Sequence, residues 1–384
     1  MDTAHHLTII SPVFPPYRSG QGSVAYENAR MASQAGIETA VYTPWYQKLR
    51  TQTPHQERTD GFTIQRLRPF FSYGNAACLV QLFWKLRSAQ TIHLHYPALG
   101  MELPVLFWSL LGKRLIVTYH MDLVGKGRCM QAFFRAYSAL FLPLILSKAA
   151  VLFVTSSDYA EQSLLLRPFY KNLRKKIIEL PNSVDTNIFS PMAPAPMIGE
   201  QPMNDYILFV GALDAAHYSK GVAVLLEACA RLTGSYTLVL IGDGDMRALY
   251  EQQAHDRGIS NHVLFIGSCA HDDLPRWYAH ARCLVLPSTD STEAFGIVII
   301  EAGASGVPSI ATRIPGVRSV VQEGETGFLV APKNAIELAE KIQFILSHPD
   351  RARSMGHAAQ RRVNERYAYD AVGRIYVRAI TGCM

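Results

Sequence analysis

Short, mainly apolar runs alternate with longer amphipathic segments along most of this 384-residue chain. Runs of this kind are typical of strands buried on both faces of a sheet, and helical connections between them indicate parallel βαβ units. In the first half, strands are predicted at residues 6–11, 38–43, 91–96, 114–120 and 150–156. In the second half, they are predicted at residues 206–212, 236–242, 262–267 and 283–288. The alternation predicts an α/β protein with two successive parallel sheets.

The two alternating halves are separated by residues 190–204, which hold four prolines and show no periodicity. Such a composition is typical of an interdomain linker. The chain also exceeds the roughly 250–300 residues at which a single hydrophobic core stops growing. We therefore expect a first domain at residues 1–192 and a second at residues 193–366. Because ligands of such folds bind beyond the carboxyl ends of the strands, we expect the two domains to share a cleft.

Composition argues against several other classes of protein. The formal net charge of +6 is spread along the chain without a nucleic-acid-binding signature, so no nucleic-acid partner is expected. The six cysteines lie far apart without metal-ligand spacing, and Asp243-Gly244-Asp245 is interpreted as a turn and helix cap, so no metal is expected. The N-terminus lacks a secretory-signal pattern, and Pro143 and Lys148 interrupt the apolar run 139–154. We expect a cytoplasmic protein.

Two glutamates, Glu293 and Glu301, flank an apolar helix that follows the predicted strand at 283–288. The intervening loop brings Glu293 to the carboxyl end of that strand, and the amides around Phe295, Gly296 and Ile297 form a helix N-terminus suited to phosphate. Glu301, further along the helix, is placed to accept hydrogen bonds from the two hydroxyls of a ribose. Together they indicate a nucleotide site. The alternative is that Glu293 only caps the helix and Glu301 is an exposed helix residue.

Four further residues lie just after predicted strands. Lys220 stands between a strand and a helix, where it can neutralise a diphosphate. Gly20 and Gly22 allow the backbone to approach a phosphate at a helix start, and His120 can donate to a sugar hydroxyl. Each has a structural alternative: an exposed loop lysine, turn glycines, or a histidine with a purely structural role.

Taken in order, these residues and several short segments resemble the retaining glycosyltransferases of family 4 over nearly the whole chain. The segments are TYH (118–120), PNSVDTNIF (181–189), VGALDAAHYSKG (210–221), IGDGD (241–245), LPS (286–288), EAFGIVIIE (293–301) and GETGFLVAP (324–332). The resemblance implies the GT-B fold, with two facing Rossmann-like domains, an interdomain cleft and a last helix, within residues 367–384, that returns to the first domain. It implies sugar transfer from a nucleotide diphosphate donor, with retained anomeric configuration and without a metal or other cofactor.

The resemblance also implies a role for each of these residues. Glu293 contacts the donor-sugar hydroxyls, and the backbone of Phe295, Gly296 and Ile297 binds the sugar and the diphosphate. Glu301 binds the ribose, Lys220 the diphosphate, Gly20 and Gly22 the distal phosphate, and His120 lies over the sugar. In the implied mechanism the acceptor hydroxyl attacks on the leaving group's face and the departing phosphate takes its proton. Catalysis then consists mainly of electrostatic stabilisation of the leaving diphosphate.

The donor is expected to be a UDP-sugar, with a GDP-sugar as the alternative. The acceptor is a saccharide or a lipid-linked molecule in polysaccharide, lipopolysaccharide or glycolipid biosynthesis. A departure from the family at Ala212, where an arginine usually joins the lysine on the diphosphate, leaves two alternatives open. Either Arg18 or His217 supplies the missing cation, or the chain is a nucleotide-sugar-binding partner with weakened catalysis. A soluble disaccharide or sugar-phosphate synthase is a third interpretation.

Residues 126–148 combine Lys126, Arg128 and Arg135 with phenylalanine and leucine. A segment of this composition can lie on a membrane surface, which would make the protein peripheral at the inner face of the membrane. The more common alternative for such a segment is an ordinary helix buried in the domain.

Overall fold

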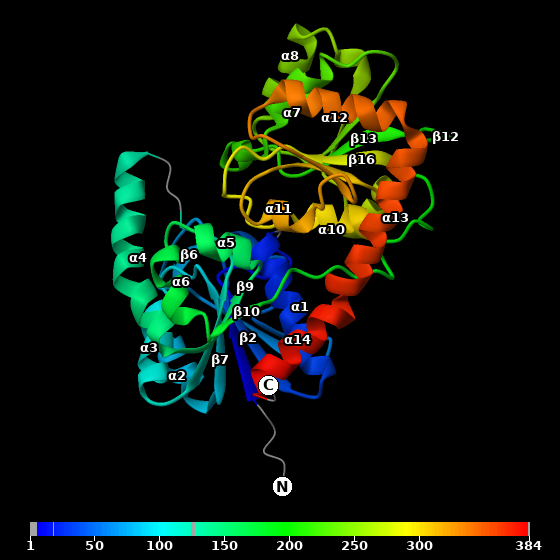
Figure 1. The fold of residues 1–384 in the computed structure, drawn as a ribbon. Coiled ribbons are helices and arrows are strands. Elements are labelled where there is room, and N and C mark those ends of the chain that lie inside the picture. Colours follow the sequence, from blue (N-terminus) through cyan, green and yellow to red (C-terminus); the bar gives the residue numbers. More distant parts are fainter. Residues whose placement is uncertain (1–5, 18, 124–126, 383–384) are drawn as a thin grey trace. The chain divides into compact units, whose positions relative to one another are not determined.

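The structure is a computed structural model that describes residues 6–17, 19–123 and 127–382. It divides into two compact units: the first comprises the chain up to Pro181 together with the segment from Val372 on, and the second runs from Asn182 to Ala371. The boundary predicted at residues 192/193 falls inside the second unit. Each unit contains a parallel sheet flanked by helices (Figure 1), so the predicted α/β class is confirmed.

The sheet of the first unit has eight strands in the order β10-β9-β8-β7-β1-β2-β4-β3. Among the described residues, β3 pairs antiparallel with β4 and all other neighbours in this sheet run parallel. The strands are β1 (His6–Ile10), β2 (Glu38–Pro44), β3 (Gln56–Thr59), β4 (Phe62–Leu67), β7 (Thr91–Tyr96), β8 (Arg114–Tyr119), β9 (Ala149–Val154) and β10 (Ile177–Glu179). The order reverses between β1 and β7, and ligands of open α/β sheets bind beyond the carboxyl ends of strands at such a point.

The helices of the first unit cover both faces of this sheet. They are α1 (Gly20–Gln34), α2 (Leu82–Lys85), α3 (Glu102–Leu110), α4 (Arg128–Lys148), α5 (Ser157–Gln162) and α6 (Arg167–Leu173). A small hairpin of β5 (Phe71–Tyr73) and β6 (Ala76–Cys78) precedes α2. Helix α14 (Tyr369–Thr381) enters this unit at Val372, where Tyr376 Oη lies 2.9 Å from His93 Nδ1 and Ala379 O accepts from Arg114 at 2.9 Å.

The sheet of the second unit has six parallel strands in the order β15-β14-β13-β16-β17-β18. They are β13 (Tyr206–Val210), β14 (Leu238–Ile241), β15 (Val263–Gly267), β16 (Ala281–Leu286), β17 (Ser309–Thr312) and β18 (Gly327–Val330). The helices include α7 (Val222–Cys229), α8 (Arg247–Asp256), α9 (Leu274–Ala279), α10 (Ile297–Ala304), α11 (Val317–Val320), α12 (Ala335–Ser347) and α13 (Pro349–Arg366). Here the order reverses between β13 and β16. Within the proline-rich segment, β11 (Met197–Ile198) pairs with β12 (Gln201–Pro202).

Helix α4 differs from the more common expectation for its segment. It runs through Pro143 over 21 residues, and its buried residues are Ser138, Leu142, Ile145 and Leu146. The interpretation of this segment as an ordinary buried helix is therefore wrong. By length and composition α4 could cross a membrane, because the helix starts ahead of the apolar run considered in the sequence and Pro143 does not end it.

A glycine at the start of α7 is required by close packing, and this gives a prediction. Gly221 has φ +76°, and a Cβ there would lie 2.0 Å from the carbonyl oxygen of Pro287. Because that atom is backbone, we expect Gly221→Ala to lower the free energy of unfolding by about 3 kcal/mol or more, measured by chemical denaturation. Gly234→Ala is the matched control, since Gly234 has φ +82° but no described atom within 4 Å of its Cβ position, so about 1–2 kcal/mol is expected. Equal losses in the two variants would contradict the packing argument.

Candidate functional site

A lysine–glutamate ion pair stands at the carboxyl edge of the second sheet. Lys220 ends a short 3₁₀ helix, Ala215–Lys220, and Glu293 lies in the loop between β16 and α10. Lys220 Nζ donates to Glu293 Oε2 at 2.9 Å, with the two side chains 21% and 19% exposed. Gly211, just past β13, leaves room for the lysine, since a Cβ there would lie 2.8 Å from Lys220 Cδ. The pair is thus packed in place and still open to a ligand.

Hydrogen bonds connect the loop that carries Glu293 to the 3₁₀ helix that ends at Lys220. Thr289 N donates to Ser219 O at 2.7 Å, and the hydroxyls of Ser219 and Thr292 lie 2.8 Å apart. Thr292 N donates in turn to Asp290 Oδ1 at 3.0 Å. These bonds fix the positions of Lys220 and Glu293 before any ligand arrives, which is the condition for electrostatic preorganisation.

The predicted phosphate-binding helix start is formed by Gly296. This residue precedes α10 with φ +82°, and a Cβ there would lie 2.8 Å from Leu286 Cδ2 and 2.9 Å from Ile299 Cδ1. Among the described residues no side chain caps α10, and its first turn holds no acidic residue. The carboxylate of Glu293 is hydrogen-bonded to Lys220 instead. Whether its charge also interacts with the start of α10 stays a prediction. The amide of Ile299 donates to Gly296 O at 2.9 Å. The amides ahead of it, at the very start of the helix, are in the position that suits an anion.

Glu301 is buried within α10, with 8% of its surface exposed. Tyr278 Oη on α9, itself fully buried, donates to Glu301 Oε2 at 2.6 Å. Burial raises the pKa of the Glu301 carboxyl, and the Tyr278 hydrogen bond with the charges of His271 and Lys220 offsets part of that rise. The interpretation of Glu301 as an exposed helix residue is therefore wrong. Its carboxylate has been desolvated on folding, which is costly unless the charge is paired or used.

In the first unit, the two predicted glycines have different environments. Gly20 is exposed at the first position of α1, whereas the amide of Gly22 donates to the N-cap hydroxyl of Ser19 at 3.1 Å. A Cβ at Gly22 would lie 3.3 Å from the backbone of Val13, so this glycine serves close packing and the cap. Of the two, Gly20 has the exposed position suited to a phosphate. Arg18, the first candidate for the missing cation, lies outside the described residues.

His120 directly follows β8 and is almost fully buried, at 5% exposure. Its Nε2 lies 2.9 Å from His95 Nδ1, with the two rings stacked at 5.1 Å between centroids. Burial lowers the pKa of His120 to about 3. The imidazole is therefore neutral at physiological pH, so it can act as a hydrogen-bond donor but not as a protonated acid.

The environment of His95 indicates which nitrogen of His120 carries the proton. His95 is fully buried, and its Nε2 has no hydrogen-bond partner among the described residues. An unpaired buried N–H is rarer and costlier than an unpaired acceptor, so we infer that His95 carries its proton on Nδ1. That N–H then donates to His120 Nε2, which leaves the proton of His120 on Nδ1. Sequence reasoning missed His95, although the spacing HLHY on a central strand could have suggested it.

Removing the ring nitrogens of His95 tests this arrangement. We expect His95→Phe to lower kcat roughly 10- to 100-fold, because His120 loses the contact that fixes its tautomer and orientation, while nucleotide affinity stays unchanged. His95→Gln keeps an amide donor and should restore most of kcat. The measurement is steady-state kinetics of the sugar transfer that the sequence resemblance implies, together with calorimetric nucleotide binding. Equal losses in both variants would mean that His95 only supports the fold.

Asp122 fixes the loop that follows His120. Its carboxylate accepts from Tyr119 Oη at 2.5 Å, from Ser163 Oγ at 2.5 Å and from the amide of Leu164 at 2.8 Å. Sequence reasoning gave this residue no role, although it stands two positions after His120. The network ties the end of β8 to the segment after α5 and so holds His120 in place.

The second candidate for the missing cation, His217, is already engaged. Its Nδ1 lies 2.8 Å from Asp214 Oδ1, and its side chain is 52% exposed. Burial acts to raise the pKa of Asp214, but the contacts with His217 outweigh it and the pKa is lowered. Any positive charge on His217 is therefore partly neutralised by Asp214. Whether Arg18 or His217 replaces the arginine that the family usually has at position 212 stays a prediction.

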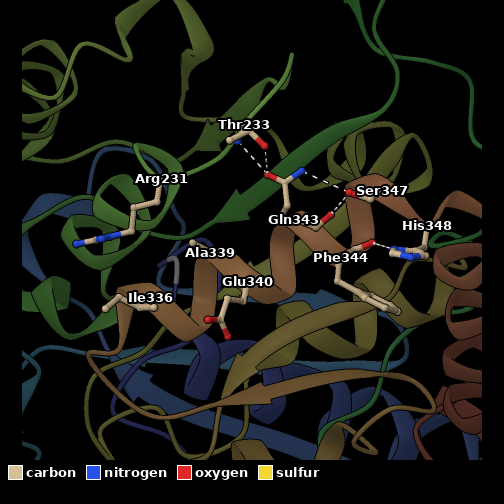
Figure 2. A pocket seen from close by; sticks show the side chains of 9 residues that line it. All are labelled: Arg231, Thr233, Ile336, Ala339, Glu340, Gln343, Phe344, Ser347 and His348. Atoms are coloured by element: carbon tan, nitrogen blue, oxygen red, sulfur yellow. Dashed lines mark hydrogen bonds between the residues drawn. The ribbon is translucent and has the colours of Figure 1, made fainter.

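Among the described residues, neither a metal-binding cluster nor the groove beside α12 adds to this site. No group of three or more histidine, cysteine or acidic side chains gathers in the described part of the chain in a way that could hold a metal ion. A groove of about 560 Å³ lies between the end of α7 and α12, and several of its polar groups bond to one another (Figure 2). Gln343, for example, accepts from the amide of Thr233 at 2.9 Å and donates to Ser347 Oγ at 3.4 Å. Nothing in this groove points to a ligand.

Comparison with known proteins gives family matches over both halves of the chain. The family described as Glycosyltransferase Family 4 matches residues 18–188, and that described as Glycosyl transferases group 1 matches residues 197–362. D-rhamnosyltransferase WbpZ of Pseudomonas aeruginosa is 27% identical over 313 residues, which cover 79% of this chain and 78% of that protein. Matches to other curated relatives span as little as 43% of their length.

Solved structures share the fold over nearly the whole chain. Sucrose-phosphate synthase from Thermosynechococcus elongatus superposes with a TM-score of 0.77 and 24% identity, covering 96% of each chain. HepE of Anabaena, solved in complex with UDP, gives a TM-score of 0.75 and 18% identity, covering 98% of this chain and 100% of that one. At these identities the likeness establishes the fold alone.

Proposed function

Because this chain belongs to the family 4 glycosyltransferases and has the GT-B fold, we propose that it moves a sugar from a nucleoside diphosphate sugar to a saccharide or lipid-linked acceptor. We propose a UDP-sugar as the donor, with a GDP-sugar as the alternative, in the biosynthesis of a polysaccharide, lipopolysaccharide or glycolipid. The binding of UDP by a protein of the same fold supports the first choice. The observation that carries the proposal is the cluster of Lys220, Glu293 and the uncapped start of α10 at one sheet edge.

In the proposed reaction the bond between the anomeric carbon and the diphosphate oxygen breaks, and a bond to the acceptor oxygen forms on the same face. The proton of the acceptor hydroxyl passes to the departing phosphate, so no metal or other cofactor is needed. The protein has to stabilise the charge that develops on the diphosphate. Donors already in place in a partly buried site do this without reorganisation during the reaction.

The Lys220–Glu293 ion pair can bind both the diphosphate and the donor sugar. An ammonium group has three donors, so Lys220 can keep its bond to Glu293 and still donate to phosphate oxygens. The same bond orients the Glu293 carboxylate, whose other oxygen then accepts from hydroxyls of the donor sugar. The amides of Phe295, Gly296 and Ile297 bind sugar and diphosphate, and Gly20 binds the distal phosphate. Gly22, whose amide is committed to Ser19, supports that turn.

The burial of Glu301 and His120 supports the roles that we propose for these two residues. Glu301 accepts from the ribose hydroxyls, with Tyr278 holding its carboxylate in position. His120 is neutral and donates a hydrogen bond to the sugar, with His95 fixing its tautomer. We also propose that the protein works in the cytoplasm, peripherally at the inner face of the membrane.

The test is to mix the purified protein with UDP-sugars and GDP-sugars and to measure thermal stabilisation and nucleotide release. Stabilisation by one nucleotide class and release of that nucleotide in the presence of an acceptor are expected. Failure of every nucleotide sugar to bind would contradict the proposal. Binding without turnover, for any acceptor or water, would favour a nucleotide-sugar-binding partner instead. Turnover with a soluble sugar or sugar phosphate would identify a disaccharide or sugar-phosphate synthase.

A further inference from the structure

Helix α3 presents apolar side chains to solvent in a regular stripe. Leu103, Phe107 and Leu110 are 61%, 45% and 65% exposed, and Leu111, just past the helix, is 60% exposed. The spacing of four, seven and eight residues places all of them on one helix face. The opposite face is buried and includes the carboxyl group of Glu102. A surface helix normally shows the reverse pattern, with its polar residues outward.

Helix α4 continues this apolar surface. Phe133, Leu140 and Leu144 are 55%, 61% and 50% exposed and repeat at intervals of seven and four residues. The buried Ser138, Leu142, Ile145 and Leu146 mark the opposite side of the helix. The exposed side chains of α3 and α4 together are called the apolar face below.

The two helices lie side by side on the same face of the first sheet. They are the successive connections β7-α3-β8 and β8-α4-β9, and right-handed connections that proceed in one direction place their helices on one face. Tyr137 Oη on α4 donates to Glu102 Oε2 at the start of α3 at 2.5 Å, which joins the two helices. Figure 1 shows α3 and α4 next to each other. Trp84 on the neighbouring α2 is 70% exposed and extends the apolar surface.

This surface is surrounded by positive charge. Residues 68–148 hold nine lysines and arginines but two acidic residues, a net charge of +7, compared with +6 for the whole chain. One of the acids, Glu102, is 1% exposed, and the other, Asp122, is hydrogen-bonded to Tyr119 and Ser163. Lys85, Arg87, Arg135 and Lys148 are exposed. Apolar side chains among basic ones complement a membrane surface with anionic lipids.

We propose that the apolar face is a docking surface for the interfacial region of a bilayer that contains anionic lipids. The inference rests on the peripheral membrane association proposed above, to which it gives a surface and a lipid class, and not on the donor or the transfer step. Both α3 and α4 start where β7 and β8 end, at the edge of the sheet that carries His95 and His120. Docking by these helices therefore brings this edge near the headgroups, within reach of a lipid-linked acceptor.

Helix α4 lies on the membrane and does not cross it. Its length of 21 residues corresponds to about 30 Å, enough for a bilayer core. However, the strands before and after it, β8 and β9, are hydrogen-bonded neighbours, and Leu142, Ile145 and Leu146 pack inward with 0–1% exposure. A helix that crossed the bilayer would have to separate these two strands.

The test is flotation of the full chain with vesicles of phosphatidylcholine, with and without phosphatidylglycerol. We expect binding to the mixed vesicles that weakens with salt, and little binding to pure phosphatidylcholine. A triple variant, Leu103→Gln, Leu110→Gln and Leu140→Gln, should bind the mixed vesicles at least about 30-fold more weakly. Lys85→Gln with Arg87→Gln and Arg135→Gln should lose at least about tenfold on the same vesicles.

The matched control replaces exposed apolar residues of the second unit, with Met192→Gln, Leu249→Gln and Ile336→Gln. These side chains are 89%, 48% and 57% exposed, and vesicle binding should not change. The melting temperature of all variants should stay at that of the parent, since each side chain is exposed.

Several results would overturn the proposal. One is that the parent fails to bind the mixed vesicles, and another is that the leucine variant binds them as well as the parent does. A third such result is a parent that binds no vesicles and forms a dimer in solution, which the leucine variant converts to monomers. The last result would assign the apolar face to a second copy of the chain. Nucleotide binding, measured by calorimetry without lipid, reports separately on the proposed function, so the two failures can be distinguished.

Discussion

Replacing Glu293 with alanine is expected to lower kcat for sugar transfer by about 100- to 1,000-fold while nucleotide affinity changes little. The carboxylate faces the donor sugar in the proposed site, where it has no assigned role toward the nucleoside, and Lys220 Nζ holds it at 2.9 Å. Its loss removes an interaction that matters in the transition state more than in the nucleotide complex. Transfer kinetics and calorimetric titration with the free nucleotide measure the two effects separately.

Lys220→Ala provides the comparison for this variant. If the lysine contacts the diphosphate, its loss should weaken binding of the nucleoside diphosphate and leave binding of the nucleoside unchanged. The double variant separates this from a purely internal ion pair, because residues that serve only each other give a double loss no larger than either single loss. Parent-like transfer by Glu293→Ala, or equal effects of the two variants on diphosphate affinity, would show that the roles assigned here are wrong.

Most central strands of the two sheets could be predicted because each is a short run of mainly apolar residues. The strand predicted at 91–96 is β7 (Thr91–Tyr96), and the prediction at 38–43 agrees with β2 (Glu38–Pro44) to within one residue. The edge strand β3 of the first sheet and its partner β4 could not be predicted in this way. β3 reads Gln-Glu-Arg-Thr because one side of an edge strand meets solvent, and its partner β4 alternates buried and half-buried residues. Such patterns are weaker signals than a run buried on both faces.

For the site, residues that follow central strands could be predicted, but their partners could not. Lys220, Glu293 and His120 stand at strand ends, a position that sequence alone indicates. Tyr278, which bonds Glu301, and His95, which bonds His120, are separated from their partners by 23 and 25 residues. No local spacing encodes such pairs, because each depends on how the helices and strands pack against each other.

The extent to which α4 is exposed could not be predicted, because it also depends on how the elements pack. An apolar helix of a large domain is usually buried, and sequence does not show how much of it neighbouring elements cover. Here the sheet covers one narrow side, centred on Leu142 and Ile145, and leaves Phe133 and Leu140 exposed. The charge asymmetry of residues 68–148, by contrast, is visible in the sequence.

Replacing Glu301 is expected to weaken nucleotide binding about 100-fold and to leave the chemical step largely intact. In Glu301→Gln the two ribose hydroxyls lose a charged acceptor, and a hydrogen bond to a charged group contributes about 1.5–3 kcal/mol. The amide is close in size to the carboxylate and can still accept from Tyr278, so the fold of α10 should persist. Calorimetric titration with the nucleoside and the nucleoside diphosphate should show equal losses for both, because the ribose is common to them.

The pH dependence of binding gives an independent check on this role. Burial raises the pKa of Glu301, so its carboxylate takes up a proton at a higher pH than an ordinary glutamate. Affinity that depends on the charged form should therefore fall as pH decreases through this raised pKa, and the acid-side decrease should be much smaller in Glu301→Gln. Tyr278→Phe is the matched control: it removes the hydrogen bond that lowers the pKa, so the decrease should move to higher pH. Unchanged pH profiles in both variants would mean that the buried carboxylate serves the packing of α9 on α10 and not the nucleotide.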